Sequence, residues 1–387
     1  MSAGAVVTAK GARRWAAGHP WIFRSDVSRR PRESAGAVAV SDTRGAPLGW
    51  ALWSPSSEIS LRLIDASPNA HIDHAWWRAR LARAIERRAP LAQTTNACRL
   101  VHGEGDGLPS VIVDRYDRWL VVQLLSAGAE SFRETIVAAL TELLGPAGIL
   151  ARNDVAVRAR ERLPQDVELL AGDVPRTIEV VEHGVRYLAA PYDGQKTGAF
   201  LDQRDNRVRA GAVARGRALD CFAYHGSFAL HLARRAEHVT AVDSSAPALA
   251  RAAENVALNG FANVELVEAD AFEFLRTAER DRQRFDTIVV DPPAFAKTRA
   301  TLRSALRGYH EINLRAMRLL APEGTLLTAS CSFHMSKSLF LEMLQGAAAD
   351  AGRRLTLREF VGQPLDHPEV LTIPETGYLK AALIEAD

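Results

Sequence analysis

Short apolar runs separated by turn residues fill the first 75 residues of the chain. The run AVAVSDTRG at 37–45 precedes LGWALW at 48–53, and this spacing predicts a β-hairpin. The run EISLRLI at 58–64 predicts a further strand. We therefore expect a small β-rich module over residues 1–75.

A helix should follow this module within residues 73–90. Asp73 is placed to cap its first turn, and Pro90 lies beyond its end. Its arginines would form a basic face. The expected apolar stripe consists of Trp76, Leu81 and Ile85.

The pattern then changes to a mixture of strands and helix that contains no catalytic constellation. We assign residues 76–190 to the linker helix and an α+β middle domain. The elements expected there are a strand, turn and strand at 110–125, a helix at 130–144, a strand at 145–154, and a hairpin at 177–191 that turns at His183-Gly184.

From residue 217 onward, strand and helix patterns alternate. This alternation predicts a parallel sheet with helices on both faces, so we assign residues 191–387 to a doubly wound α/β domain. The expected strands are 217–222, 238–243, 263–270, 285–293 and 325–331, with 355–361 and 377–385 closing the chain.

Four of these strands carry an acid at or near their carboxyl ends: Asp220, Asp243, Asp270 and Asp291. Each alone is more often a helix cap than a ligand. Together they should converge at one edge, because ligands of such sheets lie outside the carboxyl ends of the strands. Asp243 follows Asp220 by 23 residues, which is the spacing of a ribose-binding acid. Gly226 in the turn AYHGSF lets the backbone approach a ligand closely.

The turn after the first strand of this domain has one glycine, whereas a dinucleotide fingerprint needs three. The chain also has no GxxxxGKS phosphate loop. A ligand with a ribose and adenine but no pyrophosphate fits better, which favours S-adenosylmethionine. Its cationic sulfonium is compatible with a pocket rich in carboxylates.

The segment DPPAF at 291–295 should form a rigid loop, because two prolines fix the backbone and remove two N–H donors. Such a loop suits a flat base, with stacking on Phe295 and hydrogen bonds to Asp291. The alternative is a stiff turn with a core phenylalanine.

One of the three cysteines, Cys331, lies in LTASCSFHMS at the end of an apolar strand. Taken alone, a small buried residue is the better interpretation, because a reactive thiol needs an electropositive and partly exposed setting. Three scattered cysteines form neither a disulfide framework nor a zinc site, so we expect a reducing cytoplasm and no metal.

Composition is that of a globular protein, with 47% hydrophobic and 24% charged residues. We find no signal peptide and no apolar run that would span a membrane. The net charge of +2 is uneven: residues 1–88 carry 14 Lys and Arg against 7 Asp and Glu, a net +7, and the rest carries −5. An anionic partner and an arginine-rich solvated surface explain this asymmetry equally well.

Several motifs together resemble the bacterial 23S ribosomal RNA cytosine-5 methyltransferases of the large subunit methyltransferase I type. Beside DPPAF and SCS, they are KGARRWAAGHPWIF, RLVHGEGDGLPSVIVDRY, KTGAFLDQRDNR, LDCFAYHGSFAL and DHPEVLTIPETGYLKA. The resemblance covers nearly the whole chain. It implies an RNA-binding PUA domain, a small α+β middle domain and a class I, Rossmann-like methyltransferase domain with seven strands.

The resemblance also implies a mechanism. Cys331 would add to C6 of a cytosine, which activates C5 toward the methyl group of S-adenosylmethionine, while Asp291 holds the pyrimidine edge. The target base must leave its stack. The implied cofactor residues are Gln203, Asp220, Phe222, Tyr224, Gly226, Asp243, Asp270 and Asp291. The implied substrate residues are Lys196, Arg204, Pro292, Pro293 and Phe295.

Two positions depart from related enzymes. His225-Gly226-Ser227 stands where Thr-Gly-Gly is common, and Ala294-Phe295 stands where many RNA cytosine-5 methyltransferases carry a second cysteine. The base that removes the C5 proton is therefore unidentified. The sequence does not decide the nucleotide, free rRNA or subunit as substrate, or whether the chain forms a homodimer.

Two rival functions remain. The first is an RNA methyltransferase that acts on a guanine nitrogen, for which Cys331 would be idle. The second is a non-catalytic RNA-binding factor of ribosome assembly, against which the complete set of Asp243, Asp270, Asp291 and Cys331 argues.

Overall fold

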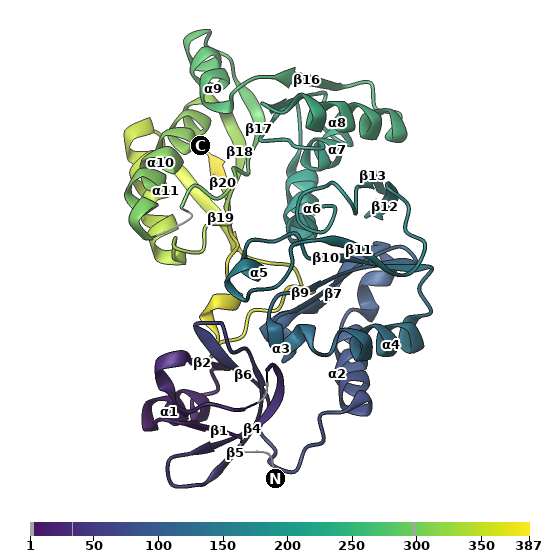
Figure 1. The fold of residues 1–387 in the computed structure, drawn as a ribbon. Coiled ribbons are helices and arrows are strands. Elements are labelled where there is room, and N and C mark those ends of the chain that lie inside the picture. Colours follow the sequence, from purple (N-terminus) through teal and green to yellow (C-terminus); the bar gives the residue numbers. More distant parts are fainter. Residues whose placement is uncertain (1–3, 33, 297–298) are drawn as a thin grey trace. The chain divides into compact units, whose positions relative to one another are not determined.

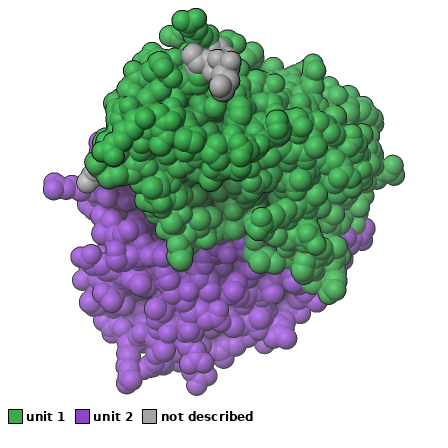
Figure 2. Space-filling model, turned by 90° about the horizontal axis from the view of Figure 1, so that it is seen from below, with its two compact units in different colours: residues 1–180, 189–201, 365–376 green, residues 181–188, 202–364, 377–387 purple. Residues whose placement is uncertain are grey.

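The computed structural model describes residues 4–32, 34–296 and 299–387. The chain forms two compact units, coloured separately in Figure 2. The first unit comprises residues 1–180, 189–201 and 365–376, and the second comprises 181–188, 202–364 and 377–387. The unit boundaries differ from the expected division at residues 75 and 190, which stays a prediction.

The N-terminal part of the first unit is a six-stranded sheet with the order β2-β6-β5-β4-β1-β3 in the described residues. The predicted hairpin and third strand are confirmed, since β4 pairs antiparallel with β5 and β5 with β6. The elements, purple in Figure 1, are β1 (Ala5–Val7), α1 (Ala9–Ala16), β2 (Trp21–Phe23), β3 (Val27–Arg29), β4 (Gly36–Asp42), β5 (Pro47–Trp53) and β6 (Ile59–Asp65).

The predicted linker helix is α2 (His74–Glu86), and Asp73 caps it by accepting from the Trp76 N–H at 3.0 Å. Its buried stripe differs from the expected one. Trp77, Leu81 and Ala84 are buried, whereas Trp76 is only half-buried. The Trp76 indole N–H donates to Asp65 at 2.8 Å, which keeps this ring at the polar margin.

The rest of the first unit is built on a five-stranded sheet with the order β11-β10-β9-β8-β7. The helices α2 and α4 pack against this sheet and share its hydrophobic core. The sequence analysis missed β7, which is buried along its whole length and shows no alternation, and β11, which is an exposed edge strand. The elements are β7 (Ala97–His102), β8 (Val111–Tyr116), β9 (Trp119–Leu124), α3 (Ala127–Glu130), α4 (Arg133–Leu144), β10 (Gly148–Arg152), α5 (Val157–Arg160) and β11 (Val167–Gly172).

The predicted hairpin is β12 (Ile178–Glu182) paired with β13 (Val185–Ala189). It turns at His183 and Gly184, whose φ angles are 49° and 81°. A two-residue turn with both residues in the left-handed region matches the twist of the flanking strands.

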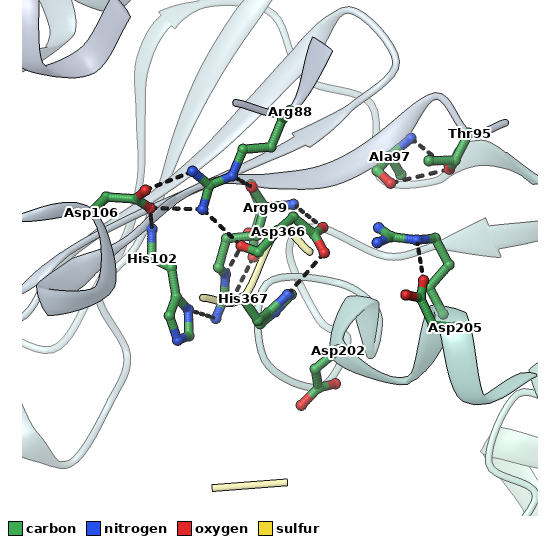
Figure 3. A network of polar contacts seen from close by, with 12 residues as sticks. Arg88, Thr95, Ala97, Arg99, His102, Asp106, Asp202, Asp205, Asp366 and His367 are labelled. Atoms are coloured by element: carbon green, nitrogen blue, oxygen red, sulfur yellow. Dashed lines mark hydrogen bonds and ion pairs between the residues drawn. The ribbon is translucent and has the colours of Figure 1, made fainter. Parts of the chain in front are cut away.

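A buried polar network in the first unit includes the late segment 365–376 (Figure 3). The Arg88 guanidinium donates to both carboxylate oxygens of Asp106, at 2.6 and 2.7 Å, and to the Asp366 carbonyl at 2.9 Å. The Asp366 carboxylate accepts from the Arg99 N–H at 2.9 Å. Arg88 therefore belongs to the interior rather than to the basic face expected for the linker helix.

The second unit contains a seven-stranded sheet in the described residues, with the order β16-β15-β14-β17-β18-β20-β19. Its strands are β14 (Arg217–Cys221), β15 (His238–Asp243), β16 (Val264–Glu268), β17 (Phe285–Val290), β18 (Leu320–Ser330), β19 (Leu355–Val361) and β20 (Lys380–Ala386). Its helices are α6 (Arg204–Val213), α7 (Ser227–Ala233), α8 (Ala246–Asn259), α9 (Ala271–Arg280), α10 (Leu302–Leu319) and α11 (Lys337–Ala351).

The parallel sheet predicted for this unit is correct for β14 to β18 but not for β20. β20 runs antiparallel to both β18 and β19, because the described segment 362–379 between β19 and β20 contains no crossover α-helix.

Both faces of the sheet are covered, as predicted (Figure 1). Leu219, Ile288 and Leu326 pack toward α9, α10 and α11. Their neighbours along the strands, including Val289 and Leu327, pack on the opposite face with α6 and α7. No helix in the described ranges is long and apolar enough to span a bilayer.

We predict that Asp106→Ala destabilises the first unit by about 3–5 kcal/mol, because it leaves the buried Arg88 cation without its carboxylate. Thermal or urea unfolding checks this value. The matched control is Asp193→Ala, which removes an exposed ion pair with Arg176 and should cost less than about 1 kcal/mol. Equal effects from the two substitutions would contradict the structural role of Asp106.

Candidate methyl-transfer site

The turn that follows β14 has a strained backbone. Phe222, Tyr224 and Gly226 have φ angles of 65°, 50° and 81°. Left-handed conformations of aromatic residues are costly and persist where the surroundings hold them. Here the Tyr224 N–H donates to Asp243 at 2.8 Å, and the Gly226 N–H donates to the Ala223 carbonyl at 2.8 Å. The turn is therefore anchored to the end of the neighbouring strand β15.

Asp243 orders the backbone around itself with both carboxylate oxygens. One oxygen accepts from Tyr224 and the other from the Ser245 N–H at 2.9 Å. Its side chain is half-buried, so its remaining lone pairs can accept hydrogen bonds from a ligand.

Asp220, at the end of β14, is fully buried. Its Oδ2 accepts from the Ala229 N–H at 2.9 Å, and its Oδ1 has no hydrogen-bond partner in the described part of the chain. Burial raises the pKa of this carboxyl well above its ordinary value, and the charges of Asp291 and Asp243 raise it further. A buried carboxyl oxygen without a partner points to a donor that comes from a ligand.

Asp291 follows β17 and is oriented by two residues of the KTGAFLDQRDNR segment. Gln203 donates from Nε2 to Asp291 at 2.7 Å, and Asn206 donates to the Gln203 amide oxygen at 2.6 Å. Gln203 thus bonds the acid at the end of β17, and its contact with the cofactor stays a prediction. Arg204 is buried and paired with Asp205 at 3.1 Å, while Lys196 belongs to the first unit, so their predicted contacts with substrate stay predictions.

Cys331 follows β18 and is half-buried, whereas Cys98 and Cys221 are buried. Because Val290 of β17 lies opposite Thr328 of β18 in a parallel pair, Asp291 and Cys331 emerge at the same sheet edge.

Both serines beside Cys331 are fully buried and bonded. The Ser332 N–H donates to the Ser330 hydroxyl at 3.3 Å. The Ser332 hydroxyl accepts from the Ala296 N–H at 3.2 Å and lies 2.9 Å from the Tyr309 hydroxyl. Burial raises the pKa of Tyr309, so this phenol stays neutral at physiological pH. Ser332 therefore fixes the cysteine loop to the loop that begins with Asp291.

The sequence analysis missed Ser332, Tyr309 and Lys380 as parts of the site. The Lys380 ammonium is buried and donates to the carbonyls of Ser332 and Tyr378, each at 2.8 Å. A lysine within the apolar strand GYLKAALIE was the available signal. Tyr309 and Ser332 carry no such signal, because their roles depend on contacts between distant segments.

Phe295 packs in an aromatic group rather than standing alone. Its ring centroid lies 4.7 Å from that of Tyr309 and 5.9 Å from that of Phe272. These contacts favour the core interpretation, and base stacking on Phe295 stays a prediction. Phe333, two residues after Cys331, is 53% exposed, so its ring is open to solvent.

The remaining predicted residues lie as follows. Asp270 is exposed and caps α9 by accepting from the Glu273 N–H at 3.0 Å, so its contact with adenine stays a prediction. Pro292 is buried and Pro293 is exposed in the loop after β17.

A buried cluster beneath the turn explains Arg207 of the RDNR segment. Arg207 donates to Glu182 at 2.6 and 2.7 Å, and His231 lies 3.1 Å from the same carboxylate. Burial alone would raise the pKa of Glu182, but the Arg207 guanidinium holds it well below its ordinary value. The cluster joins α6, α7 and the β12–β13 hairpin.

Taken together, Asp243 and Asp291 bring negative charge to the strand edge, and the buried Asp220 adds a carboxyl whose pKa is raised toward its neutral form. Such a site favours a cationic ligand with hydroxyl or amine donors. The unpartnered Asp220 Oδ1 and the accepting oxygens of Asp243 fit S-adenosylmethionine, which supplies an electrophilic methyl group when bound.

Comparison with known proteins agrees with this geometry. Residues 98–384 match the family described as S-adenosylmethionine-dependent methyltransferase, and residues 5–66 match the PUA-like domain. Proteins named ribosomal RNA large subunit methyltransferase I are 42% identical in Klebsiella pneumoniae and 40% identical in Yersinia pseudotuberculosis. Each match spans 371 residues and 94% of this chain, and it covers 93% and 94% of those proteins.

Solved structures share the fold. A structure described as a methyltransferase complexed with SAH has a TM-score of 0.85 at 22% identity, with 98% of this chain and 99% of that chain covered. A SAM-dependent methyltransferase from Streptococcus mutans has a TM-score of 0.82 at the same identity and coverage.

The fold and the strand-edge site define an S-adenosylmethionine-dependent methyltransferase with an N-terminal PUA-like domain. Within that class, the chain belongs to the ribosomal RNA large subunit methyltransferase I family. The family and cofactor predicted from the sequence are confirmed.

We predict that Asp220→Asn becomes more stable relative to the wild type as pH rises. The raised folded-state pKa means that Asp220 contributes stability below its unfolded pKa of about 3.8 and loses it as pH rises toward the folded value. The neutral amide lacks this loss, which is about 1.4 kcal/mol for each pH unit by which the folded pKa exceeds the unfolded pKa. Thermal midpoints of both proteins at pH 4.5 and pH 8 measure it. An identical difference at the two pH values would show that Asp220 is ionised in the folded protein.

We also predict that Asp243→Ala weakens S-adenosylmethionine binding by about 1.5–3 kcal/mol, because a charged acceptor is lost. Calorimetry of the purified protein measures the affinity. Asp281→Ala removes an exposed acid paired with Arg280 and serves as the control. Unchanged affinity in Asp243→Ala would remove this residue from the cofactor site.

Proposed function

We propose that this protein forms 5-methylcytosine in 23S ribosomal RNA through a covalent adduct of Cys331. The observation that carries the proposal is that Cys331 and Asp291 follow two neighbouring parallel strands and therefore lie at the same edge of the sheet. The loops of the two residues are joined there through Ser332. The ribosomal RNA substrate is inferred from the names of the relatives and from the PUA-like domain.

The chemistry requires a nucleophile because C5 of cytosine is too electron-poor to take a methyl group unaided. The Cys331 thiolate forms a bond to C6, and the electrons of the C5–C6 double bond move toward C5 and the ring nitrogens. Asp291 accepts from the exocyclic amine and so holds the ring in place. S-adenosylmethionine, held by Asp220, Asp243 and the turn at 222–226, would supply the methyl group that C5 takes, and its sulfur would leave as a neutral thioether. Loss of the C5 proton restores the double bond and releases the thiolate.

The other two cysteines do not fit this role. Cys98 and Cys221 are buried, and burial raises the pKa of the Cys221 thiol, which favours its unreactive form. Cys221 is the last residue of β14 and packs in the sheet core. Cys331 also follows the end of a strand, but it is half-buried, so its thiol is partly exposed.

We assign different parts of the site to the cofactor and to the base. Asp220, Asp243 and the turn at 222–226 would hold the cofactor. Asp291 and Cys331 would hold the flipped base, and Phe333 is exposed where a neighbouring base could stack. The N-terminal module would add phosphate contacts, which depend strongly on salt.

We predict that Cys331→Ala binds S-adenosylmethionine and RNA but forms no 5-methylcytosine, because no other thiol can add to C6. Mass spectrometry of nucleosides from treated 23S RNA measures the product. An RNA that contains 5-fluorocytosine should trap the wild type covalently, since the fluorine cannot leave as a proton does.

Cys221→Ala is the matched control and should still form the covalent complex with the fluorinated RNA. Methylation by Cys331→Ala at a rate comparable to the wild type would refute covalent catalysis. The enzyme acting on a guanine nitrogen would then be the better interpretation, and methylguanine in the same digest would identify it.

A further inference from the structure

Lys380 is a buried cation that contacts the cysteine loop of the proposed active site. It is the first residue of β20, it is 2% exposed, and it lies opposite Ser330 in the antiparallel pair of β18 and β20. Its ammonium donates to the Ser332 carbonyl at 2.8 Å. Cys331 is the residue between these two serines, so the ammonium is fixed against the peptide segment that carries the thiol.

The choice of lysine here is informative. Only five of the 48 Lys and Arg residues in this chain are lysines. A buried ammonium is costly, and an apolar side chain of similar length would fill the same space at the end of an apolar strand. A lysine differs from an arginine in carrying a compact point charge on a narrow stem, and here that charge is held by the Ser332 carbonyl of the cysteine loop. The position therefore calls for a localised positive charge.

The charges around Cys331 explain why such a charge is useful. From β17, Asp291 brings a carboxylate to the same edge, which disfavours a second negative charge nearby. From α10, Tyr309 contributes a neutral phenol, and His334 follows in the cysteine loop. A thiolate at Cys331 needs a cation to offset the carboxylate, and Lys380 is the cation that β20 presents.

We propose that Lys380 is a positioning residue that holds the Cys331 loop and shifts the thiol of Cys331 toward its nucleophilic thiolate form. The inference rests on the proposed role of Cys331 as the nucleophile. Lys380 acts through Cys331 and touches neither the methyl group nor the base. No proton transfer is assigned to Lys380.

The pH dependence of Cys331 alkylation tests this assignment without RNA or cofactor. Iodoacetamide reacts with thiolates, and Cys98 and Cys221 are buried, so peptide mass spectrometry can follow Cys331 alone. The wild-type midpoint should lie below the ordinary thiol value of about 8.5. Lys380→Met should raise the midpoint by about one pH unit or more, the usual effect of losing an adjacent opposite charge.

Two further variants separate charge from packing. Lys380→Arg keeps the charge and should hold the midpoint nearer to the wild type than Lys380→Met does. Lys337→Met removes an exposed lysine of the same unit and should leave the midpoint unchanged. Circular dichroism establishes that each variant is folded.

An unchanged midpoint in folded Lys380→Met would overturn the proposal. If that variant does not fold, the wild type decides alone, because a midpoint at or above about 8.5 is incompatible with a stabilised thiolate. A lowered midpoint in a protein that makes no 5-methylcytosine would refute the proposed function, while the assignment of Lys380 would stand.

Discussion

The hydrogen bonds of Ser332 are the constraint on which the candidate site depends. Its hydroxyl accepts from Ala296 and pairs with Tyr309, its N–H donates to Ser330, and its carbonyl accepts from Lys380. The segments around Ala296, Tyr309 and Lys380 thus meet at one small residue of the cysteine loop. Because the residue is fully buried, none of these bonds competes with water. These hydrogen bonds fix the position of the Cys331 loop and of the loop that begins with Asp291.

The acids at the strand ends accept hydrogen bonds from the protein's own backbone. Asp243 bonds two backbone N–H groups, and Asp270 caps a helix. The structural and functional interpretations of such residues are therefore compatible. A carboxylate that orders a turn with some of its lone pairs retains others for a ligand. Asp220 differs because one of its buried oxygens has no partner in the described residues.

Local pattern was sufficient to predict most of the second unit. Strands and helices alternate there with clear stops, such as Gly260 at the end of α8, where φ is 68°. The hydrophobic pattern did not reveal β7, because this strand is buried along its whole length and shows no alternation of buried and exposed positions. The pattern also did not show that β20 runs antiparallel to β18. The hydrophobic pattern placed Trp76 in the buried stripe of α2, whereas Trp77 is the tryptophan that is buried. The pattern does not show the hydrogen bond from Trp76 to Asp65, which distinguishes the two neighbouring residues. Motifs identified Asp291 and Cys331, but contacts across the fold were needed to find Ser332, Tyr309 and Lys380.

The order in which the chain visits its two units has a consequence for dissecting the protein. Residues 181–188 belong to the second unit, 189–201 return to the first, and 365–376 return to it again near the C-terminus. Neither unit is thus a continuous stretch of sequence, and a single cut cannot release either one whole. A truncation at residue 190 would deprive the first unit of Asp366, which bonds Arg88 and Arg99 in its interior. Gene fragments of this enzyme should therefore misfold where circular permutants, which keep every segment, retain a complete set of contacts.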